Sequence, residues 1–440
     1  MSDLSQIISE FETLTIDNDL TKTIISLKNQ ADSYSELSKL IDLYLIPQES
    51  EKKQNAEIST PSFLRQEMLD QIPADFWKKP RKVLEPCSGK GGFLLDIIDR
   101  FIKHLPSSTE EKYRLIVEEC LYWSDINSTN VFICQLLLNN KYRLNYYCGD
   151  ALDFDWSKKF DRISDSDQIF KFDLVVGNPP YNDNSGNKGV GHNIWTKFIT
   201  QAINVWLDNG YLLFVNPSGW RQYDNKILRL FQKYQLHYLE IHDEKDGMKT
   251  FNCGTRYDWY LLEKVEPYRQ TRIKDQEGKN IKIYLNEWDF IPNFHFAKIN
   301  ELLAESEEER CQIINDRSNY ECRGKHMSKI RTEEFCYPCV YAVNLKENKF
   351  YWSSRNDRGH FGIPKVIYKV GNACLKDPEG KYALTQWCTG IVCPAEEQDR
   401  LVQIYQSQEF KRIKNAVTVS QHSVNVEILQ LFKERWWLEI

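Results

Sequence analysis

The sequence predicts an α/β fold, in which a mostly parallel, doubly wound sheet is followed by a C-terminal α+β domain. Two observations support this prediction. Between about residues 60 and 265, short apolar runs alternate with segments of helical periodicity, which is typical of a parallel sheet with helices on both faces. After about residue 300 the alternation stops, and short segments rich in aromatic and basic residues follow.

The predicted strands are short apolar runs bounded by polar or turn residues: 82–86, 115–123, 143–148, 172–177, 211–216, 237–242 and 259–265. The predicted helices separate these runs, at about 92–104, 127–139, 191–208 and 222–235. Because no helix separates the last two strands, we expect them to pair antiparallel at an edge of the sheet.

Three regions are predicted along the chain: a helical N-terminal extension and linker (1–57), the α/β domain (58–300) and a second domain (301–440). In the extension, apolar residues recur at helical spacing, and Ser33 with Glu36 is a candidate capping box. The apolar residues of the first predicted helix are Leu4, Ile7, Phe11 and Leu14.

Composition places the chain among globular proteins, with 41% hydrophobic and 27% charged residues and a net charge of −6. No secretory signal or membrane-spanning run is visible, and the twelve cysteines lack framework spacing, so we expect a cytoplasmic protein with reduced cysteines and no membrane partner. The pairs Cys336/Cys339 and Cys388/Cys393 resemble zinc half-sites, but no His pair completes them. We therefore expect no metal site.

A glycine-rich turn, "EPCSGKGGF" (85–93), follows the first predicted strand. Gly89 and Gly91 allow a tight turn, and the next helix offers free N–H groups. The fingerprints of dinucleotide and phosphate loops are not met. Glu85, at the strand end, disfavours a phosphate and suits a cationic ligand such as an amino-acid ammonium, which favours S-adenosylmethionine as the cofactor.

Two further acids end the next two predicted strands. Asp125, in "SDIN", is placed to accept both hydroxyls of a ribose, and Asp150, in "GDAL", to accept from an adenine amino group. Each acid alone is more often a helix N-cap or a solvated loop residue. Three acids at three strand ends of one sheet edge indicate a nucleoside-like ligand.

The sequence "NPPY" (178–181) follows the predicted strand 172–177. Asn178 presents a side-chain carbonyl and Pro179 a backbone carbonyl, which together fit the two protons of an exocyclic amine. Pro180 stiffens the turn, and Tyr181 offers a flat ring for stacking against a planar base. We interpret this turn as a rigid clamp for an aromatic amine.

These motifs resemble those of the gamma-class amino-group DNA methyltransferases, the N6-adenine-specific enzymes of restriction–modification systems. The resemblance implies a Rossmann-like catalytic domain over 58–300 and a DNA target-recognition domain over 301–440. It implies catalytic roles for Asn178, Pro179, Pro180 and Tyr181. It implies S-adenosylmethionine binding by Thr60, Pro61, Glu85, Pro86, Cys87, Gly89, Gly91, Phe93, Asp125, Ile126, Asp150, Ala151 and Asn178. The chain departs from the family pattern at Ser88, where Cys is usual, and at Lys90, where Ser or Thr is usual.

The C-terminal region interleaves basic and aromatic residues, a pattern that fits contacts to phosphates and bases of DNA. The predicted DNA-binding residues are Arg323, Lys325, Lys329, Arg331, Arg355, Arg358 and Lys365. The aromatic residues interleaved with them include Tyr341, Tyr351, Trp352, Phe361 and Tyr368. The competing interpretation is a solvated face with aromatic residues in the core.

The sequence thus predicts a site-specific DNA methyltransferase that transfers a methyl group from S-adenosylmethionine to N6 of a flipped adenine in double-stranded DNA. Two alternatives use the same clamp or fold: an RNA-adenine or protein-glutamine methyltransferase, and a catalytically silent DNA-binding subunit. The recognition sequence, the oligomeric state and the existence of a companion restriction endonuclease are left open.

Overall fold

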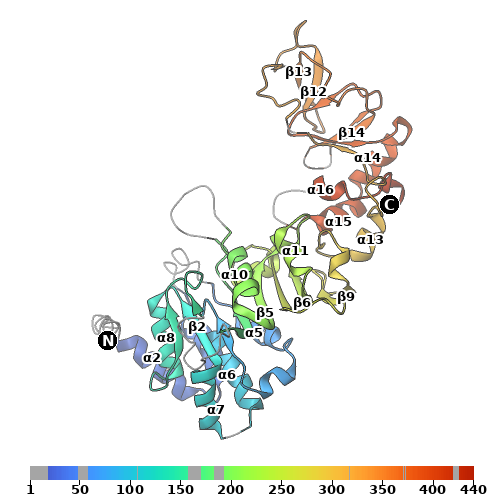
Figure 1. The fold of residues 1–440 in the computed structure, drawn as a ribbon. Helices are drawn as coiled ribbons and strands as arrows, with labels where there is room; N and C mark the ends of the chain where they lie inside the picture. The colour runs from blue at the N-terminus through green and yellow to red at the C-terminus, as the bar shows by residue number, and fades with distance from the viewer. Residues whose placement is uncertain are drawn as a thin grey trace. The chain divides into compact units, whose positions relative to one another are not determined.

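The computed structural model describes residues 18–47, 58–106, 108–156, 170–182, 193–316, 318–369, 371, 373–419 and 426–440 (Figure 1). The chain divides into two compact units. The first comprises Met1–Trp220 and Asn225–Trp288, and the second comprises Arg221–Asp224 and Asp289–Ile440. The predicted boundary between residues 300 and 301 lies inside helix α13 (Phe296–Leu302), which belongs to the second unit.

The first unit is built on a nine-stranded sheet with the order β3-β2-β1-β4-β5-β7-β6-β8-β9. Its strands are β1 (Val83–Glu85), β2 (Leu121–Asp125), β3 (Asn145–Cys148), β4 (Phe172–Gly177), β5 (Leu207–Pro217), β6 (Gln235–His242), β7 (Tyr257–Glu263), β8 (Thr271–Lys274) and β9 (Asn280–Ile283). The five strands from β3 to β5 are parallel, and β7 runs antiparallel between β5 and β6. The predicted α/β class with a mostly parallel sheet is confirmed.

The predicted antiparallel pair is β6 and β7, but its predicted place at the sheet edge is wrong. β7 lies between β5 and β6, and β8 pairs parallel to β6 on its other side. The β8–β9 hairpin then extends the sheet further. β6 therefore runs in the direction of β4 and β5, so its C-terminal end lies at the same edge as theirs.

The apolar run 115–123 is not one strand, contrary to the prediction. Helix α7 (Thr109–Leu115) begins with a capping box formed by Ser108 and Glu111, and a π-helical turn, Ile116–Cys120, continues it. Strand β2 begins only at Leu121. A short buried apolar run has the same composition in a helix and in a strand, so composition alone does not separate them.

Helices cover the sheet of the first unit. They are α5 (Ser62–Leu69), α6 (Gly92–His104), α7, α8 (Ser128–Leu138), α10 (Trp195–Gln201), α11 (Lys226–Phe231) and α12 (Glu244–Phe251). Two predicted helices are shorter than expected: α11 occupies only part of 222–235, and α10 passes into a π-helical turn at Ala202–Trp206. Residues 191 and 192 of the predicted helix 191–208 lie outside the described residues.

Two N-terminal helices, α2 (Asn18–Gln30) and α3 (Tyr34–Tyr44), form a hairpin that packs against α8 and α6. Their apolar faces form a cluster with α6 and α8 that includes Ile24, Leu27, Leu37, Ile41, Leu95, Ile133 and Leu137. Ser33 caps α3 as predicted, because its hydroxyl accepts from Glu36 N at 3.1 Å. The Glu36 carboxylate accepts from Asp32 N. The predicted helical residues Leu4 to Leu14 lie outside the described residues.

The second unit is α+β. One four-stranded sheet has the order β10-β17-β14-β15 and the other has the order β11-β13-β12-β16. The strands are β10 (Ile313–Ile314), β11 (Met327–Ser328), β12 (Tyr337–Ala342), β13 (Lys349–Ser353), β14 (Lys365–Tyr368), β15 (Cys374–Asp377), β16 (Ala383–Leu384) and β17 (Thr389–Val392). Its helices are α13, α14 (Gln398–Gln406), α15 (Gln408–Val417) and α16 (Val426–Leu429). Across the described parts of both units, no helix has the length and apolar character needed to cross a membrane.

Candidate active site

A cavity of about 390 Å³ opens in the first unit where β1, β2, β3 and β4 end. In open α/β sheets, ligands bind at this edge. Its walls come from α3, the segment before α5, the β1–α6 turn, the loops after β2, β3 and β4, and α10. The predicted cofactor residues that line it are Thr60, Glu85, Pro86, Cys87, Gly89, Phe93, Asp125, Ile126, Asp150, Ala151 and Asn178. Pro61 and Gly91 are not among its lining residues.

The glycine-rich turn after β1 forms the floor of the cavity. Gly89 and Gly91 adopt left-handed backbone conformations, with φ of 50° and 84°, that side chains other than glycine rarely take. Gly89 N donates to Asp125 Oδ2 at 2.8 Å, which ties the turn to the end of β2. Helix α6 then begins at Gly92 without a side-chain cap. The glycine-rich turn thus connects two acidic strand ends: Glu85 at the end of β1 and Asp125 at the end of β2.

Glu85 ends β1 and is only 2% exposed. Its Oε2 atom accepts no hydrogen bond from any residue that the structure describes. Burial raises the pKa of Glu85 well above its usual value; nearby Arg65 opposes this rise, and Asp125 and Asp96 add to it. A buried carboxylate with an open acceptor is costly unless a cation or a donor approaches it. Glu85 therefore places an acceptor oxygen without a donor among the described residues in the cavity wall, where a cationic group could pair with it.

Asp125 is held in place by the backbone around it. Oδ2 accepts from Gly89 N, and Oδ1 accepts from Asn127 N at 2.8 Å and from Asn130 Nδ2 at 3.3 Å. A ligand hydroxyl that binds Asp125 would share its carboxylate with these backbone and side-chain donors. Next to it, Ile126 is 62% exposed and lines the cavity, so it offers an apolar surface beside a polar anchor.

Asp150 follows β3 and serves partly as a turn residue. Its Oδ1 accepts from Leu152 N at 2.9 Å, a local Asx-type bond. Gly149 N donates to Asp125 O, which fixes the end of β3 beside the end of β2. Asp150 still lines the cavity, as does the buried Ala151.

The turn after β4 places Asn178 in the cavity. Its Oδ1 atom is buried and accepts no hydrogen bond from the described residues. Pro180 also lines the cavity, whereas Pro179 is buried and is not a lining residue. An isolated antiparallel bridge between Asn182 and Asn193 pins the far side of the turn. The turn thus presents one open amide oxygen on a rigid support.

Tyr181 is half-buried and does not line the cavity. Burial raises the pKa of Tyr181 above its usual value of 10, and Tyr257, Asp258 and Cys253 raise it further. Its hydroxyl therefore lies near the start of β7. The ring's predicted stacking role remains a prediction.

Lys90, one of the two residues that depart from the pattern of the resembled family, lines the cavity. It is 9% exposed, and its Nζ donates to Asn130 Oδ1 at 3.2 Å. Asn130 Nδ2 in turn donates to Asp125. The Lys90 charge is thus connected to the Asp125 carboxylate through Asn130.

Sequence reasoning missed the contribution of the N-terminal hairpin and of α5. Asp42 of α3 and Arg65 of α5 both line the cavity, as do Ile41 and Leu45. The signal lay in the apolar face of α3, where Ser38 and Asp42 stand four residues apart beside Leu37 and Ile41. Polar residues at this spacing beside a buried face indicate a buried partner.

Most of the predicted DNA-binding residues are exposed on the second unit: Arg323, Lys325, Lys329, Arg331 and Arg358. Arg331 lies over the Trp352 ring, 5.0 Å from its centroid. Arg355 is half-buried and pairs with Asp357 at 2.7 Å. These positions leave the first five side chains accessible to a large ligand.

Lys365 is at odds with its prediction. It is fully buried on β14, and its Nζ forms an ion pair of 2.9 Å with buried Asp377 on β15. The same nitrogen donates to the carbonyls of His360 and Ile363. Lys365 holds two strands together, and contact with a phosphate would require its ammonium to leave a satisfied buried pair.

The four cysteines of the two pairs that resemble zinc half-sites differ in their burial. Cys339, Cys388 and Cys393 are buried, and Cys336 is half-buried. Among the described residues, no group of three or more His, Cys, Asp or Glu side chains has a geometry that could hold a metal ion.

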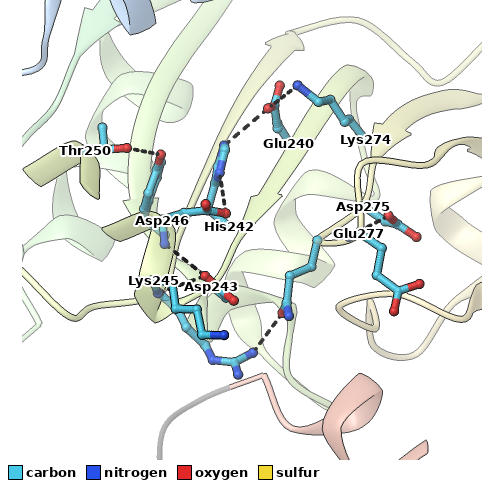
Figure 2. Close-up of polar contacts among 12 residues, drawn as sticks. Glu240, His242, Asp243, Lys245, Asp246, Thr250, Lys274, Asp275 and Glu277 are labelled. Carbon is cyan, nitrogen blue, oxygen red and sulfur yellow. Dashed lines mark hydrogen bonds and ion pairs between the residues drawn. The ribbon is translucent and has the colours of Figure 1, made fainter. Parts of the chain in front are cut away.

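A second polar cluster, formed by Glu240, His242, Asp246 and Lys274, lies at the ends of β6 and β8. Figure 2 shows His242 between the carboxylates of Glu240 and Asp246, and Lys274 reaching Glu240 from β8. The His242 ring stacks on Tyr257, with centroids 4.3 Å apart. Burial would raise the pKa of Glu240, but His242, Lys274 and Tyr238 outweigh it and lower this pKa to about 2. This cluster is an ion network at the same sheet edge as the cavity.

Comparison with known families gives one match. Residues 119–251 match the family model described as Eco57I restriction-modification methylase. This segment includes Asp125, Asp150 and the Asn178–Tyr181 turn, and it begins after β1 and the glycine-rich turn. No curated protein matches the sequence.

Solved structures with a similar arrangement include three that belong to restriction–modification systems. A modification subunit assigned to a type I restriction enzyme of Vibrio vulnificus YJ016 is 19% identical, over 55% of this chain and 52% of that chain, with a TM-score of 0.38. A type I methyltransferase subunit from Streptococcus thermophilus is 15% identical, over 58% and 57%, with a TM-score of 0.39. The type IIL enzyme MmeI, solved with DNA, is 11% identical, over 92% and 70%, with a TM-score of 0.46. The chain spans about half the length of the modification subunits that it matches.

Proposed function

We propose that this chain is a DNA methyltransferase of the restriction–modification type, which uses S-adenosylmethionine to methylate N6 of adenine. One observation carries the proposal: two buried acceptor oxygens, Glu85 Oε2 and Asn178 Oδ1, belong to one cavity, and neither has a donor among the described residues. Glu85 Oε2 lies near other acidic side chains, and Asn178 Oδ1 belongs to the Asn-Pro-Pro turn. The first suits a cation, and the second suits an amine that is to be methylated.

The acidic groups around the cavity support the choice of cofactor. Glu85, Asp125, Asp150 and Asp42 line it, against the cations Lys90 and Arg65. Counted with full charges, the four acids exceed the two cations, so the cavity favours a ligand with positive charge. S-adenosylmethionine supplies an activated methyl group on a sulfonium centre, and it also carries an ammonium group that fits Glu85.

Asn178 and Pro179 are assigned the task of holding the target amine. The two carbonyl oxygens accept hydrogen bonds from the two N–H groups of the amine. This arrangement leaves the nitrogen lone pair directed at the methyl group. The lone pair forms the new N–C bond as the S–C bond breaks, and the surplus proton then passes to water. No general base has to act before the transfer. The work of the turn is therefore positioning.

The choice of adenine rests on Asn at the first position of the turn. An amide carbonyl reaches further than a serine hydroxyl, which suits an amine on a larger purine ring. A base paired inside a duplex could not enter a cavity at the end of the sheet, so the target base would have to be flipped out.

The test is to incubate the full chain with labelled S-adenosylmethionine and, separately, genomic DNA, total RNA and protein. Nucleosides and peptides are then identified by mass spectrometry. N6-methyladenine in DNA is the expected product, and direct sequencing of the modified positions gives the recognition sequence. N4-methylcytosine would contradict adenine specificity. Methylated RNA adenine, or methylated glutamine with unmodified DNA, would contradict the substrate class, and cofactor binding without transfer to any substrate would support a silent subunit.

Duplex recognition is assigned to the second unit, because the exposed basic residues beside Trp352 lie there. A lysine or arginine that contacts phosphate contributes about one unit to the slope of log affinity against log salt. We expect Arg331→Ala and Lys329→Ala each to lower this slope by about one unit. Lys381→Ala is the matched control, since Lys381 is exposed on the same unit but pairs with Glu379 at 2.9 Å. Equal slopes in all three variants would remove these residues from the DNA contacts.

A further inference from the structure

The N-terminal hairpin α2–α3 has no role in the proposed chemistry, yet it forms part of the cavity wall. Ile41, Asp42 and Leu45, near the end of α3, all line the cavity. Asp42 is the polar member of this group, and its side chain is 24% exposed. The hairpin therefore contributes an acid to a site whose other acids stand at strand ends.

Within the described part of the chain, the Asp42 carboxylate accepts two hydrogen bonds, both from α5. Its Oδ2 accepts from Ser62 N, at the start of α5, at 2.8 Å. Its Oδ1 accepts from Arg65 Nη1 at 2.9 Å. An acid near a helix N-terminus and beside a guanidinium is doubly stabilised, by the helix dipole and by the ion pair.

Arg65 is the centre of this arrangement and is only 2% exposed. Its Nε donates to Asp96 of α6 at 2.6 Å, and its other nitrogens donate to Asp42, to the Thr60 carbonyl and to the Ser38 hydroxyl. One guanidinium thus joins α3, the segment before α5, and α6. The space it occupies explains Gly92, where a Cβ atom would lie 2.6 Å from Arg65 Cζ.

The charge of Arg65 also acts on Glu85. Arg65 lowers the pKa of Glu85, against the larger effect of burial. Because Asp42 and Asp96 already share the guanidinium, Arg65 is kept from pairing with Glu85. The Glu85 oxygen then stays open while the nearby positive charge still favours its ionised form.

We propose that Asp42 is a positioning residue for the amino-acid end of the cofactor: it holds Arg65 so that Glu85 stays free to bind the ligand's ammonium group. This inference rests on the proposed function. It also assigns a role to the N-terminal hairpin, which becomes part of the ligand-binding unit. Asp42 does not touch the reacting atoms.

Removing the charge of Asp42 has two consequences. The site loses one negative charge near the place where a cation binds. Arg65 also loses one of its two carboxylate partners, so its charge is less compensated and competes more strongly with the ligand's ammonium for Glu85. Both effects weaken the binding of a ligand that carries an ammonium group. Neither affects a ligand without positive charge, such as 5′-methylthioadenosine.

The experiment measures, by calorimetry on the full chain, the dissociation constants of S-adenosylmethionine and 5′-methylthioadenosine. The second compound keeps the nucleoside and the sulfur but has no amino-acid ammonium. We expect Asp42→Asn to weaken S-adenosylmethionine by about tenfold, as for a lost charge-assisted contact, and methylthioadenosine by less than about twofold. Asp42→Glu should restore most of the loss. Lys39→Ala, at an exposed position of α3, is the matched control and should bind both ligands like the wild type.

The outcomes separate the inference from the proposed function. If the wild type binds no S-adenosylmethionine, the proposed function fails. If it binds and Asp42→Asn binds equally well, or loses both ligands to the same extent, the positioning role is overturned, because a general loss of structure would affect both. Thermal unfolding of each variant with and without ligand shows whether the fold is retained, and Ser38→Ala provides a second, uncharged perturbation of the same guanidinium.

Discussion

Glu85 and Glu240 are two buried glutamates on strands of the same sheet, 2% and 3% exposed, and their pKa values are shifted in opposite directions. Glu85 ends β1, and its pKa is raised. Glu240 lies near the end of β6, and its pKa is lowered to about 2. Burial is the first cause in both cases and acts in the same direction. The difference comes from the partners.

Glu240 has its cations and donors within the fold. Tyr238 donates to it at 2.8 Å, Lys274 pairs with it at 2.8 Å, and His242 lies 3.4 Å away. Among the described residues, the cation that lowers the pKa of Glu85 is Arg65, which is engaged by Asp42 and Asp96. A buried acid whose partners are present contributes to stability, whereas a buried acid whose partner is absent indicates a ligand. The comparison therefore predicts that substitutions of Glu85 and of Glu240 have opposite effects on ligand affinity and on stability.

The largest effect is expected on the rate of methyl transfer when Asn178, whose side-chain oxygen is also without a donor among the described residues, is replaced. Asn178→Ala should lower the rate of methyl transfer by about 100-fold or more, because one of the two acceptors that orient the amine is lost. Affinity for S-adenosylmethionine should stay within a few-fold of the wild type, since the acids remain.

Single-turnover kinetics and calorimetry on the same preparation measure both quantities. Asn280→Ala, on exposed edge strand β9, is the control. Normal turnover in Asn178→Ala would remove the clamp from the mechanism.

Glu85→Gln should weaken S-adenosylmethionine binding by about 1.5–3 kcal/mol, the usual cost of losing a hydrogen bond to a charged group. It should not lower the free energy of unfolding of the ligand-free chain, because the amide replaces a buried carboxyl whose ionised form is disfavoured by burial. Calorimetry and denaturant titration test the two halves. A destabilised Glu85→Gln protein with unchanged affinity would reverse the assignment, and Glu287→Gln, at an exposed site, serves as the reference.

Glu240→Gln should show the reverse pattern, with a loss of stability of about 1–2 kcal/mol and unchanged cofactor affinity. The loss stays below the 3–5 kcal/mol of a fully buried broken pair. The reason is that Lys274 is 38% exposed and can return to water. Thermal unfolding with and without S-adenosylmethionine distinguishes the two effects. If Glu240→Gln lost affinity as strongly as Glu85→Gln, the cluster would belong to the ligand site.

The smallest expected effect is a dependence of stability on pH that comes from the cluster of Glu240, His242, Asp246 and Lys274. Burial would lower the pKa of His242, but Glu240 and Asp246 outweigh it and raise this pKa above 6.5. The contribution of His242 is therefore complete below pH 6.5 and is lost as pH rises through its folded-state pKa. The Glu240 pKa is lowered from 4.5 to about 2, so its contribution is complete above pH 4.5 and is lost as pH falls toward 2.

We therefore expect the cluster to stabilise the first unit most between pH 4.5 and 6.5. The measurement is the unfolding midpoint across pH in the wild type and in His242→Gln. The variant should lose the decline above pH 6.5 that is specific to this side chain. Identical alkaline profiles would show that His242 does not titrate with folding.

The parts of the fold that the sequence predicted correctly are those with local signals. Strand β4 was predicted at its observed bounds because an apolar run ends abruptly at Asn178 and two prolines. The run from Leu115 to Trp123 was ambiguous, since Ile116 and Val117 are buried in a helical turn as fully as in a strand. Local patterns therefore give the type of an element only where its ends are marked.

The site was predictable where each residue follows a strand, and not where it depends on a distant partner. Glu85, Asp125, Asp150 and Asn178 stand at strand ends and do line the cavity. The pairing of Asp42 with Arg65 joins residues 23 positions apart. The spacing of Ser38 and Asp42 indicates a buried polar contact of α3, but no local pattern identifies Arg65 as the partner. The same limit explains the wrong prediction for Lys365. Its charge indicates an exposed residue, but the partner that buries it, Asp377, lies on the neighbouring strand.

The guanidinium of Arg65 has a consequence for motion as well as for charge. Because it joins α3 to α6, the hairpin cannot swing away from the sheet without breaking several buried hydrogen bonds at once. Local opening of α3 and opening of the ligand cavity are then one event. A ligand that binds only the closed form reduces the population of the open form by mass action. The amide protons of α3 should therefore exchange with solvent more slowly when the cavity is filled, although few of them lie near the ligand.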